Sequence, residues 1–342
     1  MNASMKRWEI SRFGVEHLTL ATAPRPEPKR GEILVKVDAV SLNFRDKEVL
    51  DNGMTAKLQF PFVPTSDMAG TVVALGEDVT RFAVGDKVIS TYITEWVDGA
   101  PASWTEMPTQ GGPIQGMLSE YVATPAAWCV RAPQSLDAAE AATLPIAGLT
   151  AWMALVELGN LRPGQTVVVQ GTGGVALFAV QIAAAAGAEV IVTSSSEQKI
   201  DRAKALGARH GIHRHREPNW EDAVQALTGG RGADHVLEMA GGDNLQRSLR
   251  AVKPGGRISI IGLLASDELR TPIMPLLGSR ANIVAVAVGP RRALEDLVRM
   301  VDLNAVKPVI DGRYAFADAP AAFAHLARGA FGKVVITMND AP

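Results

Sequence analysis

The chain has 342 residues, of which 47% are hydrophobic and 20% are charged, and its formal net charge is −2 at pH 7. This length and mixture exclude a disordered chain and are sufficient for two globular domains. The near-neutral charge, with no basic stripe, also argues against nucleic acid or an anionic membrane surface as a partner.

No uninterrupted apolar run approaches the roughly 20 residues that a transmembrane helix needs, and residues 1–10 lack the apolar core of a signal peptide. We therefore expect a cytoplasmic protein that makes no use of a membrane. A single cysteine, Cys129, excludes internal disulfides and any metal site that needs several cysteines from one chain.

The first part of the chain, up to about Gly148, has the pattern of a β-rich unit. Short runs of β-branched residues are separated by glycine and proline, as is typical of strands joined by turns. These runs cover residues 32–40, 70–75 and 86–91.

From Thr166 the pattern changes to apolar strands that alternate with helices. Strands are expected at 166–170, 189–194, 235–241 and 257–262, and helices at 175–187 and 197–207. This alternation predicts an α/β fold with a doubly wound parallel sheet. After a further apolar segment at 282–289 we expect an amphipathic helix at 291–304 and a final strand at 332–338, so the α/β unit is inserted into the β-rich one.

A glycine-rich turn follows the first of these strands, in the segment "QGTGGVALF". Gly171 permits a tight turn, Gly173 lets the backbone approach a pyrophosphate, and Gly174 and Val175 open a helix whose N–H groups face the anion. Because the turn stands between a buried strand and a long helix, it predicts a dinucleotide site rather than a purely structural turn.

Four segments together resemble the medium-chain dehydrogenase/reductase superfamily, and the similarity runs from about Arg7 to Ile336. They are "GEILVKVDAVSLNFRD", "TRFAVGDKV", "AATLPIAGLTAW" and "GTGGVALFAVQIAAAAGA". The resemblance implies a GroES-like catalytic domain formed by both chain ends (1–147 and 289–342), a Rossmann domain at 148–288 and an active site in the cleft between them. It also implies a homodimer joined through strands near residues 282–288.

The superfamily includes zinc-dependent and zinc-independent enzymes, and this chain resembles the zinc-independent, quinone oxidoreductase-like branch. Asn43 occupies the position at which the zinc enzymes have a cysteine ligand. Ser66 and Asp67 occupy the positions of a histidine and an acid in those enzymes, and the third ligand position falls near Ile146. A catalytic zinc usually has three protein ligands. The lobe at 94–116, which holds a structural zinc in the zinc enzymes, has no cysteine. We therefore expect no metal.

Without a metal, a hydrogen-bond donor has to polarise the substrate oxygen. The resemblance places Asn43 close to the nicotinamide and the substrate, and Thr150 near the nicotinamide carboxamide. The alternatives are a turn asparagine and a threonine that satisfies a helix N-terminus. Asp46 and Asp67 are more simply explained as structural, because Asp46 starts a helix and Asp67 needs a raised pKa before it can donate a proton.

The nucleotide is expected to be NADP(H). About 20 residues past the glycines an NAD site carries an acid for the ribose, and here Ser194 takes that place, which removes the charge that repels a 2′-phosphate. Ser195 can donate to the phosphate, Lys199 lies one turn into the next helix, and the resemblance adds Arg214 at the adenosine end. The alternative is a solvated loop with two ordinary surface cations.

The nicotinamide half of the site is expected beyond the carboxyl ends of the later strands, where ligands of open α/β sheets bind. The residues concerned are Ala240, Gly262, Leu263, Val288 and Gly289.

Two groups of side chains each allow a functional and a structural interpretation. Tyr92, Trp96 and Trp104 form either an apolar wall for a flat ring or the core of their lobe. The histidines of "HGIHRH" (210–215) suggest a metal site, but an exposed loop and short strand explain them better.

The sequence thus predicts a zinc-independent NADPH-dependent reductase that transfers hydride to a quinone or an α,β-unsaturated carbonyl compound. Two alternatives stay open. One is a zinc-free alcohol/carbonyl oxidoreductase, and the other is a nucleotide-binding protein with little turnover.

Overall fold

The chain folds into two units, and the second is inserted into the sequence of the first. Residues 1–149 and 288–342 make up unit 1, and residues 150–287 make up unit 2. None of the helices in the described residues is long and apolar enough to cross a bilayer. The structure is a computed structural model, and it describes residues 3–55, 57–100, 108–266 and 268–338.

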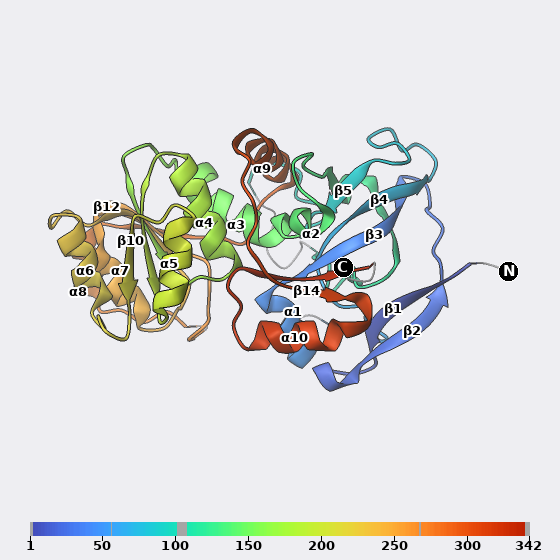
Figure 1. Cartoon of the computed structure of the whole chain (residues 1–342), viewed down its shortest axis with the longest axis horizontal. Helices are drawn as coiled ribbons and strands as arrows, with labels where there is room; N and C mark the ends of the chain where they lie inside the picture. Colours follow the sequence, from blue (N-terminus) through green and yellow to red (C-terminus); the bar gives the residue numbers. More distant parts are fainter. Residues whose placement is uncertain (1–2, 56, 101–107, 267, 339–342) are drawn as a thin grey trace. The chain divides into compact units, whose positions relative to one another are not determined.

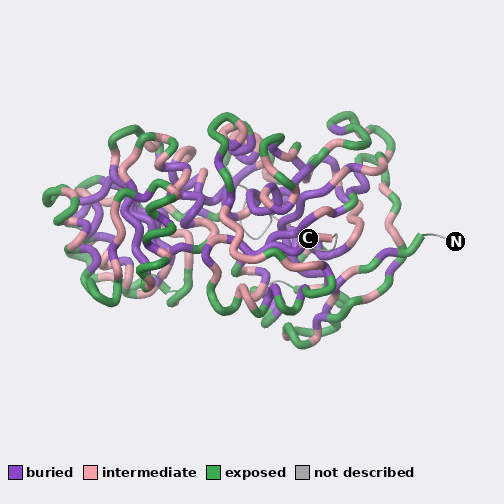
Figure 2. Tube along the Cα trace, in the orientation of Figure 1, coloured by how far each residue is buried: buried purple, intermediate pink, exposed green. Residues whose placement is uncertain are grey.

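Unit 2 is built on six strands, all parallel, in the order β10-β9-β8-β11-β12-β13. Every residue of β8 is buried, because helices cover both faces of a parallel sheet, and Figure 2 shows the central strands as buried. The predicted doubly wound α/β fold is confirmed. The strands are β8 (Thr166–Gln170), β9 (Glu189–Ser194), β10 (His210–His213), β11 (Ala233–Glu238), β12 (Val252–Ile260) and β13 (Asn282–Ala285).

The helices of unit 2 lie on both faces of this sheet (Figure 1). Two of them, α4 and α5, pack against β8, β9 and β10, whereas α6, α7 and α8 lie next to one another on the other face. The sequence analysis predicted no helix at the position of α8. The helices are α4 (Gly174–Ala185), α5 (Glu197–Ala205), α6 (Trp220–Leu227), α7 (Asn244–Ala251) and α8 (Ile273–Ser279).

Unit 1 is a β-rich unit into which the last strand of the chain is built. Its main sheet has the order β14-β15-β3-β4-β5-β7, and β6 also pairs with β3. Because β15 runs antiparallel to β3, Val334 lies opposite Leu42, and two distant parts of the sequence share one sheet. The strands are β3 (Glu32–Leu42), β4 (Asp67–Leu75), β5 (Lys87–Ser90), β6 (Tyr121–Pro125), β7 (Cys129–Arg131), β14 (Ile310–Ala315) and β15 (Lys333–Thr337).

A hairpin and several helices complete unit 1. The amphipathic pattern at 291–304 forms α9 over the whole predicted length. The remaining elements are β1 (Ser4–Ile10), β2 (Leu18–Pro24), α1 (Phe44–Asn52), α2 (Ala138–Ala141), α9 (Arg291–Asn304) and α10 (Ala319–Ala327).

The chain passes from unit 1 to unit 2 through α3 (Leu149–Trp152). A π-helical segment stands on each side of it, at Leu144–Gly148 and Met153–Glu157. Such π segments are rare and often occur at functional sites, and the apolar periodicity of the sequence did not distinguish them from an ordinary helix.

Candidate functional site

The glycine-rich turn of unit 2 has the geometry of an anion-binding turn. Gly171 has φ 82°, a left-handed conformation that glycine adopts without strain. Gly173 is the N-cap of α4, and a Cβ atom built on it would meet no heavy atom within 4 Å, so the space beside it is open. The first N–H groups of α4, at Gly174 and Val175, lack intrahelical partners and would face a phosphate placed there.

The carboxyl end of β9 carries a run of three serines. The Ser194 Oγ accepts a hydrogen bond from the N–H of Ser196 at 3.3 Å, and Ser195 is exposed. Ser196 is the N-cap of α5, since its Oγ accepts from the N–H of Lys199 at 3.4 Å. Sequence reasoning missed this cap, although a serine ahead of an acidic first turn is its usual signal.

The charged groups near this serine run are also defined. Arg214 is exposed and follows β10 directly. The carboxylate of Glu197, in the first turn of α5, accepts from Arg216 Nη1 at 2.8 Å. The Glu197 carboxylate is therefore already paired with a cation.

The strand order of unit 2 reverses between β8 and β11, and ligands of open α/β sheets bind at such a point. There the buried Glu238 carboxylate accepts from the N–H groups of Ala240 (2.9 Å) and Gly241 (3.1 Å), from Asn244 Nδ2 (2.8 Å) and from Gln170 Nε2 (3.2 Å). This network joins the ends of β8 and β11 and fixes the loop after β11. The sequence analysis did not single out Gln170 or Glu238.

The residues expected on the nicotinamide side all follow strands of the parallel sheet. Gly262 passes so close to the loop after β11 that a Cβ on it would lie 2.2 Å from the Met239 carbonyl oxygen. Val288 has φ 59°, which is unusual for a β-branched residue. The residues are Ala240 after β11, Gly262 and Leu263 after β12, and Val288 and Gly289 after β13, where the chain re-enters unit 1.

Thr150, the second residue expected to be catalytic, lies in α3 at the start of unit 2. Its side chain is buried, and the two π-helical segments flank it in sequence. It is therefore not the first residue of a regular helix, as the structural alternative assumed.

Asn43 lies in unit 1, at the junction where β3 ends and α1 begins. It is the N-cap of α1, and its backbone N–H donates to Asp46 Oδ2 at 2.7 Å. Asp46 therefore has the structural role expected of it. The Asn43 side chain itself points to other partners.

The Asn43 side-chain amide is held between two buried charged groups. Its Nδ2 donates to Asp67 Oδ2 at 2.9 Å, and its Oδ1 accepts from Lys333 Nζ at 2.5 Å. Lys333 also donates to the Leu42 carbonyl oxygen at 2.6 Å. Sequence reasoning missed Lys333, because a lysine that opens a strand usually faces solvent.

Burial changes the ionisation of these groups. Burial raises the pKa of Asp67 to about 7, although the Lys333 ammonium and the hydrogen bond from Asn43 oppose it. Burial likewise raises the pKa of Asp46 and lowers that of Lys333. The raised pKa that a proton-donating Asp67 requires is therefore present. Its Oδ1 is buried and has no hydrogen-bond partner among the residues that the structure describes.

A second cation, Arg45, ties the neighbouring loop to this cluster. Its Nη1 donates to Ser66 Oγ at 2.6 Å and to the Gly111 carbonyl oxygen at 3.2 Å. The Arg45 guanidinium also lies over the ring of Tyr92, 4.9 Å from its centroid. Tyr92 is buried, so it packs within the lobe at this point.

The other two aromatic residues considered in this lobe are placed differently. Trp96 is half-buried, and its Nε1 donates to the Gly99 carbonyl oxygen at 3.0 Å. Trp104 lies outside the described residues.

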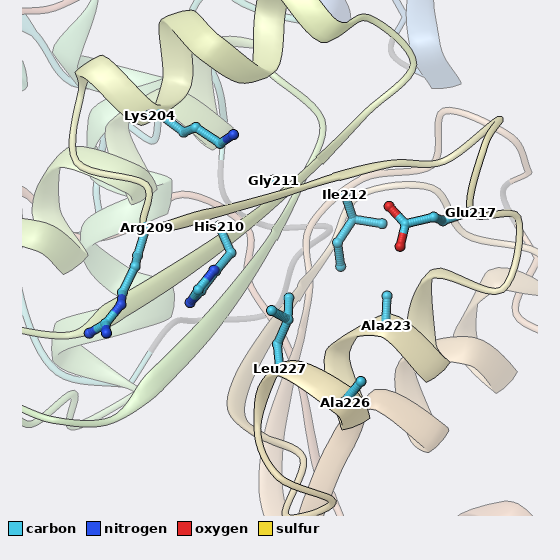
Figure 3. A pocket seen from close by; sticks show the side chains of 9 residues that line it. All are labelled: Lys204, Arg209, His210, Gly211, Ile212, Glu217, Ala223, Ala226 and Leu227. Atoms are coloured by element: carbon cyan, nitrogen blue, oxygen red, sulfur yellow. The ribbon is translucent and has the colours of Figure 1, made fainter.

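A cavity of about 330 Å³ runs along β10, at an outer edge of the parallel sheet (Figure 3). Its lining includes Lys204, Arg209 and His210. The carboxylate of Glu189 already pairs with Arg209 (3.3 Å) and His210 (2.9 Å). None of the residues expected to bind nucleotide lines this cavity.

Known proteins match nearly the whole chain. A model of the alcohol dehydrogenase GroES-like domain matches residues 29–134, and one of the zinc-binding dehydrogenases matches residues 174–303. A zinc-type alcohol dehydrogenase-like protein of Schizosaccharomyces pombe is 38% identical over 90% of this chain and 91% of its own length. The chain belongs to the medium-chain dehydrogenase/reductase superfamily.

Two further relatives show the breadth of the superfamily. The quinone oxidoreductase of Sus scrofa is 28% identical over 92% of this chain and 91% of its own length. A solved structure from Sinorhizobium meliloti 1021, provisionally named an alcohol dehydrogenase, is 57% identical, with a TM-score of 0.95 over 99% of this chain and 100% of that one. This medium-chain dehydrogenase/reductase is accordingly an oxidoreductase whose family uses a nicotinamide cofactor.

Zinc, which the superfamily implies, does not fit the residues found here. Among the described residues, no three His, Cys, Asp or Glu side chains are grouped so that they could hold a metal ion. At the ligand positions stand Asn43, Ser66 and Asp67, and the Lys333 ammonium already lies against the Asn43 oxygen. A divalent cation there would be repelled by that buried charge.

We expect the purified protein, after dialysis against a chelator, to contain far less than one zinc per chain and to keep its thermal unfolding temperature and its oxidoreductase activity. Elemental analysis and a melting curve measure the first two. A zinc-dependent member of the superfamily, treated in the same way, serves as the control. A stoichiometric zinc whose removal abolishes activity would show that the side chains at this site do bind zinc.

Proposed function

We propose that this chain is a zinc-independent, NADPH-dependent reductase that transfers hydride to a quinone or an α,β-unsaturated carbonyl compound. The observation that supports it most directly is the Asn43 amide, fixed between Lys333 and Asp67 at a position where zinc enzymes of the superfamily have a metal ligand. An amide held in this way offers a hydrogen-bond donor to a substrate oxygen without a metal.

The chemistry divides between the cofactor and the chain. Bound NADPH supplies a hydride from nicotinamide C4. As the acceptor takes the hydride, negative charge develops on its oxygen. Asn43 uses one of its two amide N–H groups on Asp67, and the other would donate to that oxygen. A proton from solvent completes the reduction, and Thr150 would orient the nicotinamide carboxamide.

The preference for NADPH is supported by the end of β9. The ribose-binding acid is replaced by Ser194, and the nearby Glu197 is paired with Arg216. Both features lower the negative charge that a 2′-phosphate would meet. Ser195, Lys199 and Arg214 would supply donors for that phosphate.

Alcohol oxidation without zinc is the second candidate, because one relative is named a zinc-type alcohol dehydrogenase-like protein and one solved structure is provisionally named an alcohol dehydrogenase. A panel of quinones, enones, enoyl thioesters and aldehydes with NADPH, run beside secondary alcohols with NADP, separates the two. Saturable NADPH binding without turnover across the panel would instead favour a nucleotide-binding protein.

Replacing Asn43 with Ala should lower the rate with the best acceptor by a factor of about ten to a few hundred, because one or two hydrogen bonds to developing charge are lost. The affinity for NADPH, measured by quenching of the cofactor fluorescence, should change little. Asn52→Ala, at the other end of α1, is the matched control and should leave the rate unchanged. An unaltered rate in Asn43→Ala would assign Asn43 a structural role only.

Two substitutions test the nucleotide preference. Ser194→Asp should reverse it, because the new carboxylate accepts from the ribose of NADH and repels the 2′-phosphate of NADPH. Lys199→Ala should weaken NADPH and spare NADH. Since one charge-assisted contact corresponds to about tenfold or more in affinity, the Michaelis constants of the two cofactors report both effects. If the unmodified protein uses both cofactors equally and neither substitution changes this, the loop after β9 does not distinguish NADPH from NADH by the 2′-phosphate.

We also propose a homodimer formed along β13. This strand pairs only with β12 among the described residues, so its other edge presents unpaired backbone groups. The helix α8, which precedes β13 in sequence, has three apolar side chains that are largely exposed: Ile273 (66%), Met274 (70%) and Leu277 (60%). A second copy of the same edge would pair these groups and cover these side chains.

The double substitution Ile283→Lys and Met274→Lys should convert a dimer into a monomer, as measured by sedimentation equilibrium, because it places charges in the proposed contact. Leu303→Lys, on α9 and 84% exposed, is the control and should remain dimeric. A monomeric unmodified protein, or a dimer that survives the double substitution, would rule out this edge as the interface.

A further inference from the structure

The two ends of the Asn43 amide are held by groups of opposite charge. The oxygen faces the Lys333 ammonium, and the nitrogen faces the Asp67 carboxylate. The side-chain amide of a solvated asparagine can rotate by half a turn and exchange the places of its oxygen and its NH₂ group, since the two are nearly the same size. Here a half-turn would place NH₂ against the ammonium and the oxygen against the carboxylate. The charges therefore select one orientation.

The amide is also the link between the two charges. Within the described residues no direct ion pair joins Lys333 to Asp67, and each of them contacts the Asn43 side chain instead. All three residues stand at element ends: Lys333 opens β15, Asp67 opens β4, and Asn43 lies between β3 and α1. Because all three are buried, solvent does not screen this arrangement.

The buried cluster holds two basic side chains, Lys333 and Arg45, and two acidic ones, Asp46 and Asp67, whose pKa values burial raises. With all four ionised, the charge of the cluster is balanced. The groups that face Asp67 are the ammonium of Lys333 from β15, the carboxylate of Asp46 from α1, the Asn43 amide, and the backbone N–H of Ile146, which donates to Oδ2 at 3.2 Å. Protonation of Asp67 would leave this buried cluster with one net positive charge.

We propose that Lys333 and Asp67 are positioning residues that hold the Asn43 amide by opposite charges, so that its free N–H is presented to the substrate oxygen only while Asp67 is a carboxylate. This rests on the proposed role of Asn43. Neither residue touches substrate in this scheme, and both act through the orientation of Asn43.

A pH dependence follows, because burial raises the pKa of Asp67 to about 7. Above that pH the carboxylate accepts strongly from Asn43 Nδ2, and below it the neutral acid accepts weakly. We therefore expect kcat/KM to fall on the acid side of about pH 7 with a single ionisation.

The first experiment is the pH profile of kcat/KM for the unmodified protein, Asp67→Asn and Lys333→Gln. Asp67→Asn should lose the acid limb and keep a rate about tenfold below that of the unmodified protein at pH 8, because its neutral amide resembles the protonated acid. Lys333→Gln keeps a donor for Asn43 Oδ1 but removes the charge, so the midpoint should rise by about one pH unit. Lys87→Gln, which removes an exposed lysine of the same sheet, should leave the profile unchanged.

The second experiment needs no turnover. An infrared titration of the unmodified protein should show a carboxylic acid band that disappears near pH 7, is missing in Asp67→Asn, and disappears at higher pH in Lys333→Gln. If a single substitution does not fold, the double variant Asp67→Asn/Lys333→Gln, which removes both charges together, avoids an unpaired buried charge. Its profile should also lack the acid limb.

The proposal is overturned if Asp67→Asn keeps the acid limb, if Lys333→Gln leaves the midpoint unchanged, or if the band titrates below about pH 5. Failure of the proposed function would look different. In that case no acceptor is reduced, while the infrared band still titrates near pH 7 and still moves in Lys333→Gln.

Discussion

A positive charge inside a protein has to be neutralised where it lies, and Lys333 brings one into the interior of unit 1. Asp46, Asp67 and the oxygens of Leu42 and Asn43 surround it. Removing one partner of such a buried set typically costs about 3–5 kcal/mol. The ends of β3 and the starts of α1, β4 and β15 are therefore tied to one another by charge as well as by the strand ladder.

Local sequence patterns predict much of the fold. Four of the six parallel strands, β8, β9, β11 and β12, overlap the apolar runs predicted between helices, and the helix at 291–304 has the apolar spacing of one buried face. The edge strand β10 is not an apolar run, and β13 lies in the predicted apolar segment but is mostly exposed. The glycine turn is equally local, since Gly171 and Gly173 act through their own backbone geometry.

The residues that escaped prediction act over long distances in the sequence. Lys333 meets Asn43 across 290 positions, and Gln170 meets Glu238 across 68. A lysine at the start of a strand and a glutamate at the end of one are ordinary surface residues unless their partners are known. Which of the polar residues are buried is decided by strand pairing, here β15 on β3 and β11 on β8, and single-sequence periodicity does not contain that pairing.

The position of β15 in the chain also sets an order of events during synthesis. Asn43 emerges 290 residues before Lys333, which corresponds to tens of seconds at the usual rate of about 5–20 residues per second. Unit 2 is continuous in sequence and is complete within that interval, at a point where the main sheet of unit 1 still lacks β14 and β15. Until β15 has been synthesised, the Lys333 ammonium is not there to neutralise Asp46 and Asp67. During synthesis, therefore, the whole of unit 2 is made before Lys333, the buried cation of unit 1.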